Sequence, residues 1–369
     1  MIVHAAVLEA FKQPLAWRAF ETLPPAPGEL LVKVEAAGIC GSDLHMWEGE
    51  DPRTPLPIIL GHEAVGRVAE LGATSGGARR DILGQPVREG DLLAWDRGVV
   101  CGACYACTVR KEPYLCSNRR TYGINLSCAQ PPHLLGGYAE YMHLLARTNV
   151  LVVPSGVDPA LLVPASCSGA TAAHAVETCR LRPGDTVVVQ GPGPLGCFAL
   201  ALARERGVGQ AILVGTRRSA WKLELARRFG ADHLLYLDDA SPAERWEQIR
   251  ALTQGRGAEA VIECSGAASA IAEGVKWLAP GGTYALAGAA VPVGEAPVAV
   301  YEDLVRKNAR LQGVWVSDTS HFYQAAQLAW SGRYPFADLI THRFPLARAG
   351  EALQALKRRE VMKAVIADR

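Results

Sequence analysis

The sequence lacks a marked excess of charge, a long apolar run and a secretory leader pattern, and each absence excludes a class of function. Its 38 Lys and Arg residues almost balance 37 Asp and Glu residues, which leaves a net charge of +1. A chain this close to electrical neutrality gives no reason to expect nucleic acid or an anionic membrane as a partner. No apolar run is long enough to cross a bilayer, and the first ten residues show neither a basic segment nor an extended apolar core. We therefore expect a cytoplasmic protein.

The length of 369 residues is too great for one typical core, so two domains are expected. The first third is rich in short apolar runs separated by Gly and Pro, a pattern that predicts a small β-barrel. Its predicted strands are Leu30–Ala36, Ala64–Leu71 and Asp91–Trp95. The polar, Gly- and Arg-rich residues 73–89 predict an exposed loop whose role the sequence leaves open.

From about residue 165 the pattern changes to alternating strands and helices, which predicts a parallel sheet with helices on both faces. The predicted strands are Thr186–Gln190, Ala211–Val214, Leu234–Leu237, Ala260–Cys264 and Thr283–Ala287. The predicted helices are Leu195–Arg206, Ala220–Phe229, Pro242–Thr253 and Ala268–Leu278. The last segment, from Leu311 to Arg369, mixes both element types, and we expect it to return to the first domain.

Four of the ten cysteines form a tight cluster, Cys101-x2-Cys104-x2-Cys107-x8-Cys116. In a cytosolic protein, clustered cysteines are more often a metal site than disulfides. Four thiolates at this spacing make a closed tetrahedral site, which favours a structural zinc ion. An iron–sulfur cluster and a pair of disulfides are the alternatives.

Three further residues, Cys40, His62 and Cys167, predict a second zinc site. Two thiolates and one imidazole suit zinc and leave its fourth position open, as in a catalytic site. The alternative is that both cysteines are core thiols and the histidine belongs to a capped turn, because the three lie far apart in the sequence.

The neighbours of these residues fit a role in proton transfer. Ser42 is placed to hydrogen-bond a substrate hydroxyl, and His45 has the side chain best suited to pass a proton near neutral pH. Asp43 and Glu63 are candidates to orient His62 and to balance the charge of the metal.

A glycine pattern, Gly191-Pro-Gly193-Pro194-Leu195-Gly196, follows a predicted strand and opens a predicted helix. This context favours a dinucleotide fingerprint, and a merely tight strand–helix turn is the alternative. In the fingerprint, the first glycine allows the turn, the second lets a pyrophosphate approach the helix N-terminus, and the third lets the helix pack closely.

The end of the next predicted strand indicates which dinucleotide is bound. NAD-preferring sites usually carry an acid there, whereas this chain reads Gly215-Thr216-Arg217-Arg218. Thr216 offers a hydrogen bond, and Arg217 suits a 2′-phosphate, so NADP is favoured. If the two arginines are only solvated helix-start residues, the site accepts NAD. A Lewis acid beside a hydride carrier predicts oxidation of an alcohol or reduction of a carbonyl.

Taken together, these motifs resemble the zinc-containing medium-chain alcohol dehydrogenase family over almost the full length. The resemblance also rests on Gly61-His-Glu-Ala-Val-Gly66 and Gly136-Gly-Tyr-Ala-Glu-Tyr141. It implies an α/β fold with a GroES-like β-barrel catalytic domain, expected at 1–160 and 306–369 with a structural zinc lobe at 98–118. A Rossmann domain is expected at 161–305. The family also implies two zinc ions per chain and a homo-oligomer, either a tetramer or a dimer.

The resemblance assigns further site residues. It places the catalytic zinc on Cys40, His62 and Cys167, with Glu63 beside them, and it puts Ser42 and His45 on the proton relay. Further cofactor contacts that it implies are Thr171 and Gly288 near the nicotinamide and Lys363 at the pyrophosphate. The spacing Cys107-x8-Cys116 is one residue longer than is common in the family.

The alcohol itself is not identified by the sequence. Trp47 and Trp95 would favour an apolar or cyclic substrate and Arg97 an acid group, although all three are equally explained by packing. A catalytically silent relative and a zinc-independent quinone reductase are the alternatives to a dehydrogenase. Both are opposed by the presence of every zinc ligand and relay residue.

Overall fold

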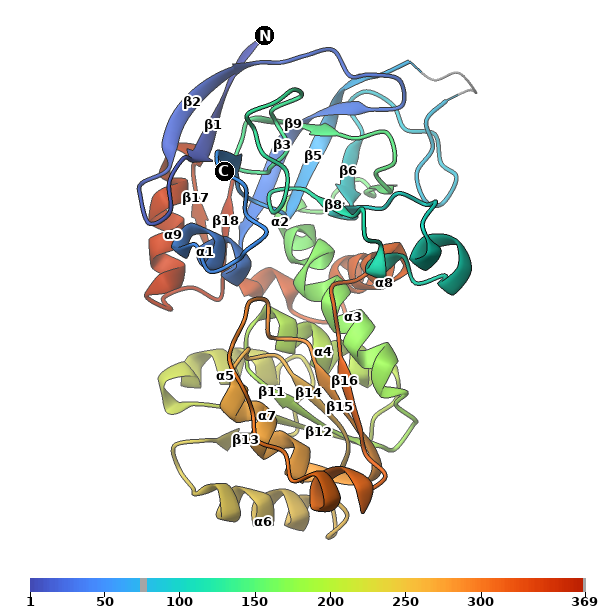
Figure 1. Cartoon of the computed structure of the whole chain (residues 1–369), viewed down its shortest axis with the longest axis vertical. Helices are drawn as coiled ribbons and strands as arrows, with labels where there is room; N and C mark the ends of the chain where they lie inside the picture. The colour runs from blue at the N-terminus through green and yellow to red at the C-terminus, as the bar shows by residue number, and fades with distance from the viewer. Residues whose placement is uncertain (74–77, 368–369) are drawn as a thin grey trace. The chain divides into compact units, whose positions relative to one another are not determined.

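The computed structural model describes residues 1–73 and 78–367, and the chain divides into two compact units (Figure 1). The first unit comprises Met1–Cys167, Asp318–Trp330 and Phe336–Arg369, and the second comprises Ser168–Ser317 and Ser331–Pro335. The boundaries differ from those expected at 160/161 and 305/306. Residues 306–317 belong to the second unit because a strand within them, β16 (Arg310–Gly313), pairs in its sheet.

The first unit is built mainly from β-strands in three sheets. A three-stranded sheet has the order β2-β1-β4, and a two-stranded sheet pairs β7 with β8. The largest sheet has the order β10-β6-β5-β3-β18-β17, with β9 also paired to β3. The strands are β1 (Ile2–Leu8), β2 (Ala16–Glu21), β3 (Leu30–Ile39), β4 (Ile58–Ile59), β5 (Ala64–Leu71), β6 (Leu92–Trp95), β7 (Gly98–Val99), β8 (Arg120–Thr121), β9 (Tyr141–Leu144), β10 (Val150–Val152), β17 (Ile340–Phe344) and β18 (Lys363–Ile366).

Short helices connect these strands and carry several of the chemical groups. The α-helices are α1 (Gly41–Glu48), α2 (Pro159–Leu162), α8 (Thr319–Trp330) and α9 (Ala349–Lys357). The shorter turns are η1 (Ala106–Arg110), η2 (Pro113–Leu115), η3 (Val163–Ser166), η7 (Phe336–Leu339) and η8 (Leu346–Arg348). The C-terminal strand β18 lies antiparallel to β3, so the end of the chain returns to this sheet as expected.

The second unit is a six-stranded parallel sheet with helices on both faces (Figure 1). Its strand order, β13-β12-β11-β14-β15-β16, is that of a doubly wound dinucleotide-binding fold. The strands are β11 (Thr186–Gln190), β12 (Gln210–Gly215), β13 (His233–Tyr236), β14 (Ala258–Glu263), β15 (Leu278–Leu286) and β16. The helices and turns are α3 (Ser168–Cys179), α4 (Pro194–Glu205), η4 (Arg217–Ser219), α5 (Ala220–Arg227), α6 (Pro242–Leu252), α7 (Ala268–Gly274), η5 (Val275–Trp277) and η6 (Val300–Val305).

Each unit buries its own hydrophobic core. In the first unit the core includes the fully buried Trp95, Tyr122 and Tyr138. In the second unit, Trp277 and Tyr284 pack with β-branched residues of the central strands. Burial of such large apolar surfaces is the main force that holds each unit together.

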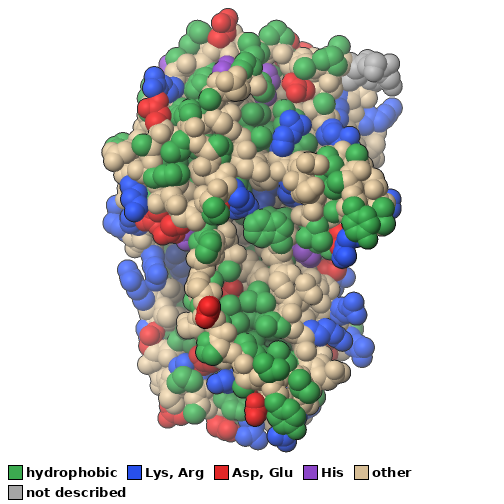
Figure 2. Space-filling model, viewed as in Figure 1, with side chains coloured by type: hydrophobic (Ala, Val, Ile, Leu, Met, Phe, Trp, Pro, Cys, Tyr) green, Lys and Arg blue, Asp and Glu red, His purple; other side chains and the backbone are tan. Residues whose placement is uncertain are grey.

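The loop expected at residues 73–89 is anchored rather than free along its described part, and residues 74–77 lie outside the described residues. The buried Asp81 carboxylate accepts hydrogen bonds from the backbone of Leu83 and Gln85, and also from Val152 of β10 at 3.1 Å. Acidic and basic side chains are interspersed on the face shown in Figure 2, as the net charge of +1 predicts. None of the helices in the described residues has the length and apolar character needed to cross a bilayer.

Candidate active site and metal centres

Three residues that are distant in the sequence meet inside the first unit. Cys40 is the N-cap of α1, His62 lies just before β5, and Cys167 directly follows η3. Their ligand atoms and one carboxylate oxygen of Glu63 all lie within 4.8 Å of one another. His62 Nε2 is 3.3 Å from Cys167 Sγ, close to the ~3.6 Å edge of a tetrahedron with ordinary Zn–N and Zn–S bonds. The donor set and its spacing therefore fit a zinc ion.

Asp43 holds this arrangement in place from the first turn of α1. One carboxylate oxygen accepts the backbone N–H of Cys40 at 2.8 Å. The other lies 3.2 Å from both His62 Nδ1 and the backbone nitrogen of Gly61. A carboxylate on Nδ1 fixes the tautomer of the ring and leaves Nε2 free to bind a metal. This is the contact that the sequence analysis expected for Asp43.

The pKa values in the site show that its groups share protons in a confined space. A hydrogen bond from the Cys167 thiol lowers the pKa of Cys40 well below its usual range, and the pKa of Cys167 itself is raised. Burial lowers the pKa of His62, but the facing Asp43 carboxylate outweighs it and raises the value to about 10. Zinc binding at this set would displace the protons of Cys167 and His62.

Glu63 pairs with Lys363 beside the metal-binding residues. Both side chains are buried, and the Lys363 ammonium forms an ion pair with the Glu63 carboxylate. The Lys363 ammonium thus neutralises a carboxylate that lies beside the metal-binding residues. Burying either charge without the other would be strongly unfavourable. The contact of Lys363 with a cofactor pyrophosphate stays a prediction.

Ser42 and His45 lie on the same side of α1, because they are three residues apart in a helix. Both are partly exposed, as is Cys40, whereas His62 and Cys167 are buried. His45 Nδ1 is 2.6 Å from a carboxylate oxygen of Glu50, which lies just beyond the end of the helix. Glu50 was not expected from the sequence, although its position near His45 is an accessible signal.

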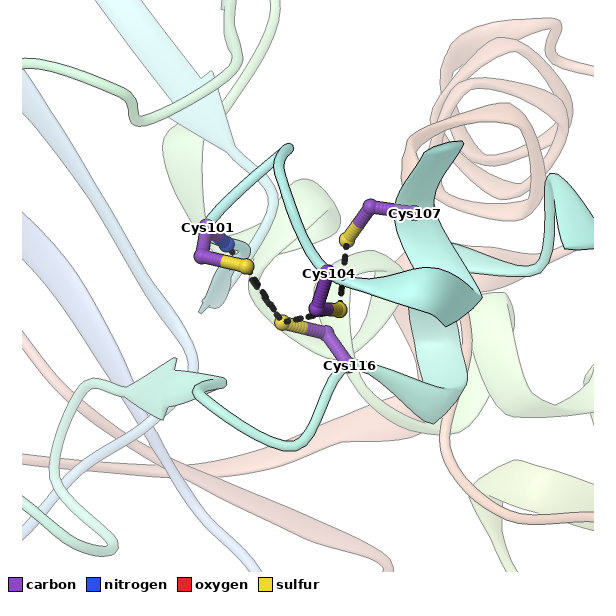
Figure 3. A group of neighbouring side chains, drawn as sticks. All are labelled: Cys101, Cys104, Cys107 and Cys116. Atoms are coloured by element: carbon purple, nitrogen blue, oxygen red, sulfur yellow. Dashed lines mark hydrogen bonds between the residues drawn. The ribbon is translucent and has the colours of Figure 1, made fainter. Parts of the chain in front are cut away.

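The four remaining candidate ligands, Cys101, Cys104, Cys107 and Cys116, converge in a lobe built around η1 and η2 (Figure 3). Successive Sγ atoms lie 3.5 Å (Cys101 and Cys116), 3.8 Å (Cys104 and Cys116) and 3.6 Å (Cys104 and Cys107) apart. Four Zn–S bonds in a tetrahedron require S–S separations of about 3.8 Å, whereas a disulfide requires about 2 Å. The lobe therefore fits a closed four-thiolate metal site and not a pair of disulfides.

In the second unit, the glycine pattern has the geometry of a dinucleotide fingerprint. Gly191 has a φ of +114°, which only glycine adopts without strain, and it turns the chain from β11 toward α4. A Cβ on Gly193, the N-cap of α4, would meet nothing within 4 Å, so this helix end is open to a ligand. A Cβ on Gly196 would overlap the carbonyl oxygen of Gly191, so α4 packs tightly there. Pro194 and Leu195 form the first turn of α4.

The end of β12 carries an exposed cation. Thr216 is half-buried, and the Arg217 guanidinium forms an ion pair with Asp239 and lies 4.0 Å from the centre of the Tyr236 ring. The backbone N–H of Arg217 also donates to Asp238. The two aspartates follow β13 and were not expected from the sequence. Arg217 is therefore available to a phosphate only in competition with Asp239.

Glu263, at the end of β14, organises the adjacent loops of the second unit. Its buried carboxylate accepts hydrogen bonds from the backbone of Ser265, Gly266 and Gly288, at 2.6, 2.7 and 3.2 Å. Gly288 must be a glycine, because a Cβ there would overlap the Gly266 nitrogen. Thr171 lies on α3 and is buried. The sequence analysis did not identify Glu263. An acid at the end of a predicted strand, two residues before Ser265-Gly266, is the signal that could have found it.

Comparison with known proteins relates this geometry to a family. Two family models match: "Alcohol dehydrogenase GroES-like domain" over residues 26–155 and "Zinc-binding dehydrogenase" over residues 194–331. A 5-exo-hydroxycamphor dehydrogenase from Pseudomonas putida is 36% identical, with 98% of each chain covered. The chain belongs to the zinc-containing medium-chain alcohol dehydrogenase family. Its fold is therefore the α/β combination of a GroES-like domain and a Rossmann domain.

Two further members of the family are similar along nearly the whole chain. An NAD-dependent alcohol dehydrogenase from Sulfurisphaera tokodaii is 32% identical, with 96% of each chain covered. The crystal structure of an alcohol dehydrogenase from Thermotoga maritima has a TM-score of 0.94 and 45% identity, covering 100% of this chain and 99% of that one. The zinc-containing alcohol dehydrogenases are oxidoreductases, and this activity class extends to the present chain.

The residues considered for substrate contact have different environments in this member of the family. Trp95 is fully buried in the core of the first unit. Trp47 donates its indole N–H to the carbonyl of Gln13 at 2.7 Å and lines a surface pocket of about 630 Å³ with residues of α9. Arg97 is buried as well, but it is a cation. Packing therefore accounts for Trp95, whereas Arg97 needs another explanation.

Proposed function

We propose that the protein is a zinc-dependent alcohol dehydrogenase that transfers hydride reversibly between a primary or secondary alcohol and NAD(P), giving an aldehyde or a ketone. The observation that carries the proposal is the convergence of Cys40, His62 and Cys167. Three protein ligands leave one coordination position for the substrate oxygen. A zinc ion held there would supply a Lewis acid that favours loss of the alcohol proton.

The residues around this set have separate tasks. Asp43 holds the His62 ring so that Nε2 faces the other two ligands. The buried pair of Glu63 and Lys363 keeps the total charge beside the ligands low. Neither task requires movement, so the site is preorganised before the alcohol binds.

Proton release runs along α1 in this proposal. Ser42 accepts the hydroxyl proton of the alcohol while it donates its own toward His45, and His45 delivers a proton to solvent. The partly exposed position of His45 and the 2.6 Å contact between its Nδ1 and Glu50 support this direction, because they connect the ring to the surface of the unit. Glu50 is itself exposed.

The second zinc ion is proposed for the four-cysteine lobe, which gives two zinc ions per chain. All four ligand positions there are filled by Cys101, Cys104, Cys107 and Cys116, so no position remains for a substrate. This zinc ion would be structural. The lobe lacks a hydrophobic core of its own, since most of its residues are partly or fully exposed.

For the cofactor we propose NADP as the preferred dinucleotide, with NAD as the alternative. The pyrophosphate would bind at the N-terminus of α4 over Gly193, and the nicotinamide would lie near Thr171 and Gly288. Thr216 and Arg217 would contact the 2′-phosphate. The ion pair between Arg217 and Asp239 is exposed and therefore weak, so a phosphate dianion is able to displace it.

We further propose a homo-oligomer, a tetramer or a dimer, that works in the cytoplasm. Strand β16 leaves one edge of its sheet unpaired, and its residues are exposed. The exposed apolar Val300, Tyr301 and Val305 lie in the nearby η6 turn. Such an edge with apolar neighbours favours association. None of the ten cysteines, all of them in the described residues, forms a disulfide, which supports a reducing compartment.

The test is steady-state oxidation of an alcohol panel, run in parallel with NAD and NADP on protein of known zinc content. The panel holds primary, secondary, cyclic, polyol and acid-bearing alcohols. The proposal predicts turnover of at least one class and reduction of the matching carbonyl in the reverse direction. Absence of turnover in protein that carries two zinc ions per chain would overturn it.

A further inference from the structure

A pair of buried arginines lies beside the metal-binding set of the first unit. Arg97 follows β6, which pairs with β5 in the register Val65 to Ala94. Arg97 lies three residues after Ala94 and His62 three residues before Val65, so the two segments extend from the same end of this antiparallel strand pair. Arg119 precedes β8 and packs over Gly98, where a Cβ would overlap its guanidinium. Arg97 is 5% exposed, and the side chain of Arg119 is 8% exposed.

The described residues provide few acceptors for these two cations. Arg97 Nε and all three guanidinium nitrogens of Arg119 are buried and lack a hydrogen-bond partner among the residues that the structure describes. The nearest carboxylate, Asp96, lies 3.7 Å from Arg119, and its oxygens already accept from Gly98 and Thr319, each at 2.9 Å. A buried guanidinium without acceptors is strongly disfavoured. A ligand that brings an anionic acceptor would remove this cost.

We propose that Arg97 binds a carboxylate of the substrate, with Arg119 strengthening the positive field behind it, so that the substrate is a hydroxy acid. This inference rests on the proposed dehydrogenase activity and names its substrate class. The planar fork of a guanidinium matches the two oxygens of a carboxylate. The hydroxyl of the same molecule then lies toward Ser42, and the carboxylate fixes which hydroxyl is presented.

The electrostatic surroundings of Arg97 are consistent with this position. Burial lowers the pKa of Arg97, but the facing Cys167, Cys40 and Glu63 raise it above its ordinary value. Arg97 therefore interacts electrostatically with two of the metal-binding cysteines and with Glu63. The competing explanation is that it only balances the charge of the two thiolates. In that case, substrates with and without a carboxylate would respond equally to its removal.

The experiment compares hydroxy acids of increasing chain length, each with its own primary amide, in the zinc-loaded enzyme. The readout is the ratio of kcat/KM for the acid to that for the amide. The proposal predicts a ratio above one for at least one chain length, and a fall of about 10- to 100-fold in Arg97→Gln. Arg97→Lys keeps the charge but not the fork, so it should retain part of the ratio. Arg67→Gln, an exposed arginine of β5, is the matched control and should keep the ratio.

Titration calorimetry with butanoate and butanamide provides a second readout that does not need turnover. The wild-type protein should bind butanoate more tightly, and Arg97→Gln should lose that preference. An equal effect of Arg97→Gln or Arg97→Lys on acid and amide would overturn the inference while leaving the dehydrogenase proposal intact. If neither the hydroxy acids nor their amides are oxidised while another alcohol of the panel is, the inference fails alone; if no alcohol of the panel is oxidised, the dehydrogenase proposal fails and the inference with it.

Discussion

At the scale of single residues, Asp43 has the largest structural influence on the proposed active site. One carboxylate positions the backbone of Cys40 and the ring of His62, and so connects two of the three metal ligands. A carboxylate that supports a histidine ligand raises the basicity of the ring and restricts its rotation. Asp43 is completely buried, so water cannot replace it.

Replacing Asp43 by Asn should therefore weaken zinc binding at the Cys40 set. We expect a loss of about 10- to 100-fold in metal affinity, with a parallel loss in activity. Competition with a chelator measures the affinity, and Asp91→Asn, which alters a backbone contact in a turn of the same unit, is the control. Unchanged zinc affinity in Asp43→Asn would mean that Asp43 serves only to cap α1.

Arg217 decides the dinucleotide in this account. Substitution by Asp should shift the ratio of kcat/KM for NADP to that for NAD toward NAD by about tenfold or more, because a phosphate dianion would then face a carboxylate. Arg218→Asp makes the same change of charge one residue away and should shift the ratio less. An identical ratio in wild type and Arg217→Asp would contradict a role for Arg217 in cofactor choice.

The metal-binding residues could be proposed from the sequence because cysteine and histidine have only a few roles in glycine-rich turns. Cysteine and histidine in glycine-rich turns suggested ligands, and their convergence agrees with that interpretation. The ion pair of Lys363 was not predicted, because a sequence does not tell which charges meet inside a fold. Its partner Glu63 lies at the start of another strand of the same sheet, and burial made the two pair.

At the scale of elements, the strands of the second unit were predictable to within one or two residues in most cases. Thr186–Gln190 is a β-branched run that ends at a glycine turn, and β11 has the same bounds. Strand β15 begins at Leu278, five residues before the predicted Thr283, because the chain resumes its pairing with β14 after an irregularity at Gly281, whose φ is +78°. Glycines that usually end a strand here lie inside one.

The four-cysteine lobe is an element whose stability depends on its metal. Cys107→Ser should lower the zinc content from two to about one per chain and lower Tm by roughly 5 °C, as expected for a loss of about 2 kcal/mol. Metal analysis and a thermal melt measure both effects. Retention of both zinc ions in this variant would show that the lobe is not a zinc site.

At the scale of the whole molecule, the division into units follows from strand pairing rather than from position along the chain. Residues 310–313 belong to the second unit because they pair with β15, and residues 363–366 belong to the first because they pair with β3. The family resemblance supplied the order of the domains, but the exact crossing points required the structure.

The two metal-binding sets also differ in how the chain assembles them. One set is assembled from three distant segments inside the first unit, and the other comes from a single local lobe. In our proposal, the zinc ion of the first set is catalytic and that of the second set is structural. Removal of one thiolate from each set therefore gives a matched pair of variants.

The most direct test measures zinc content and alcohol oxidation in Cys40→Ser beside Cys107→Ser. Cys40→Ser should hold about one zinc ion per chain, keep its circular dichroism spectrum and lose turnover. Cys107→Ser should also hold about one zinc ion but retain turnover at temperatures well below its lowered Tm. Turnover that survives in Cys40→Ser would contradict the assignment of the catalytic site.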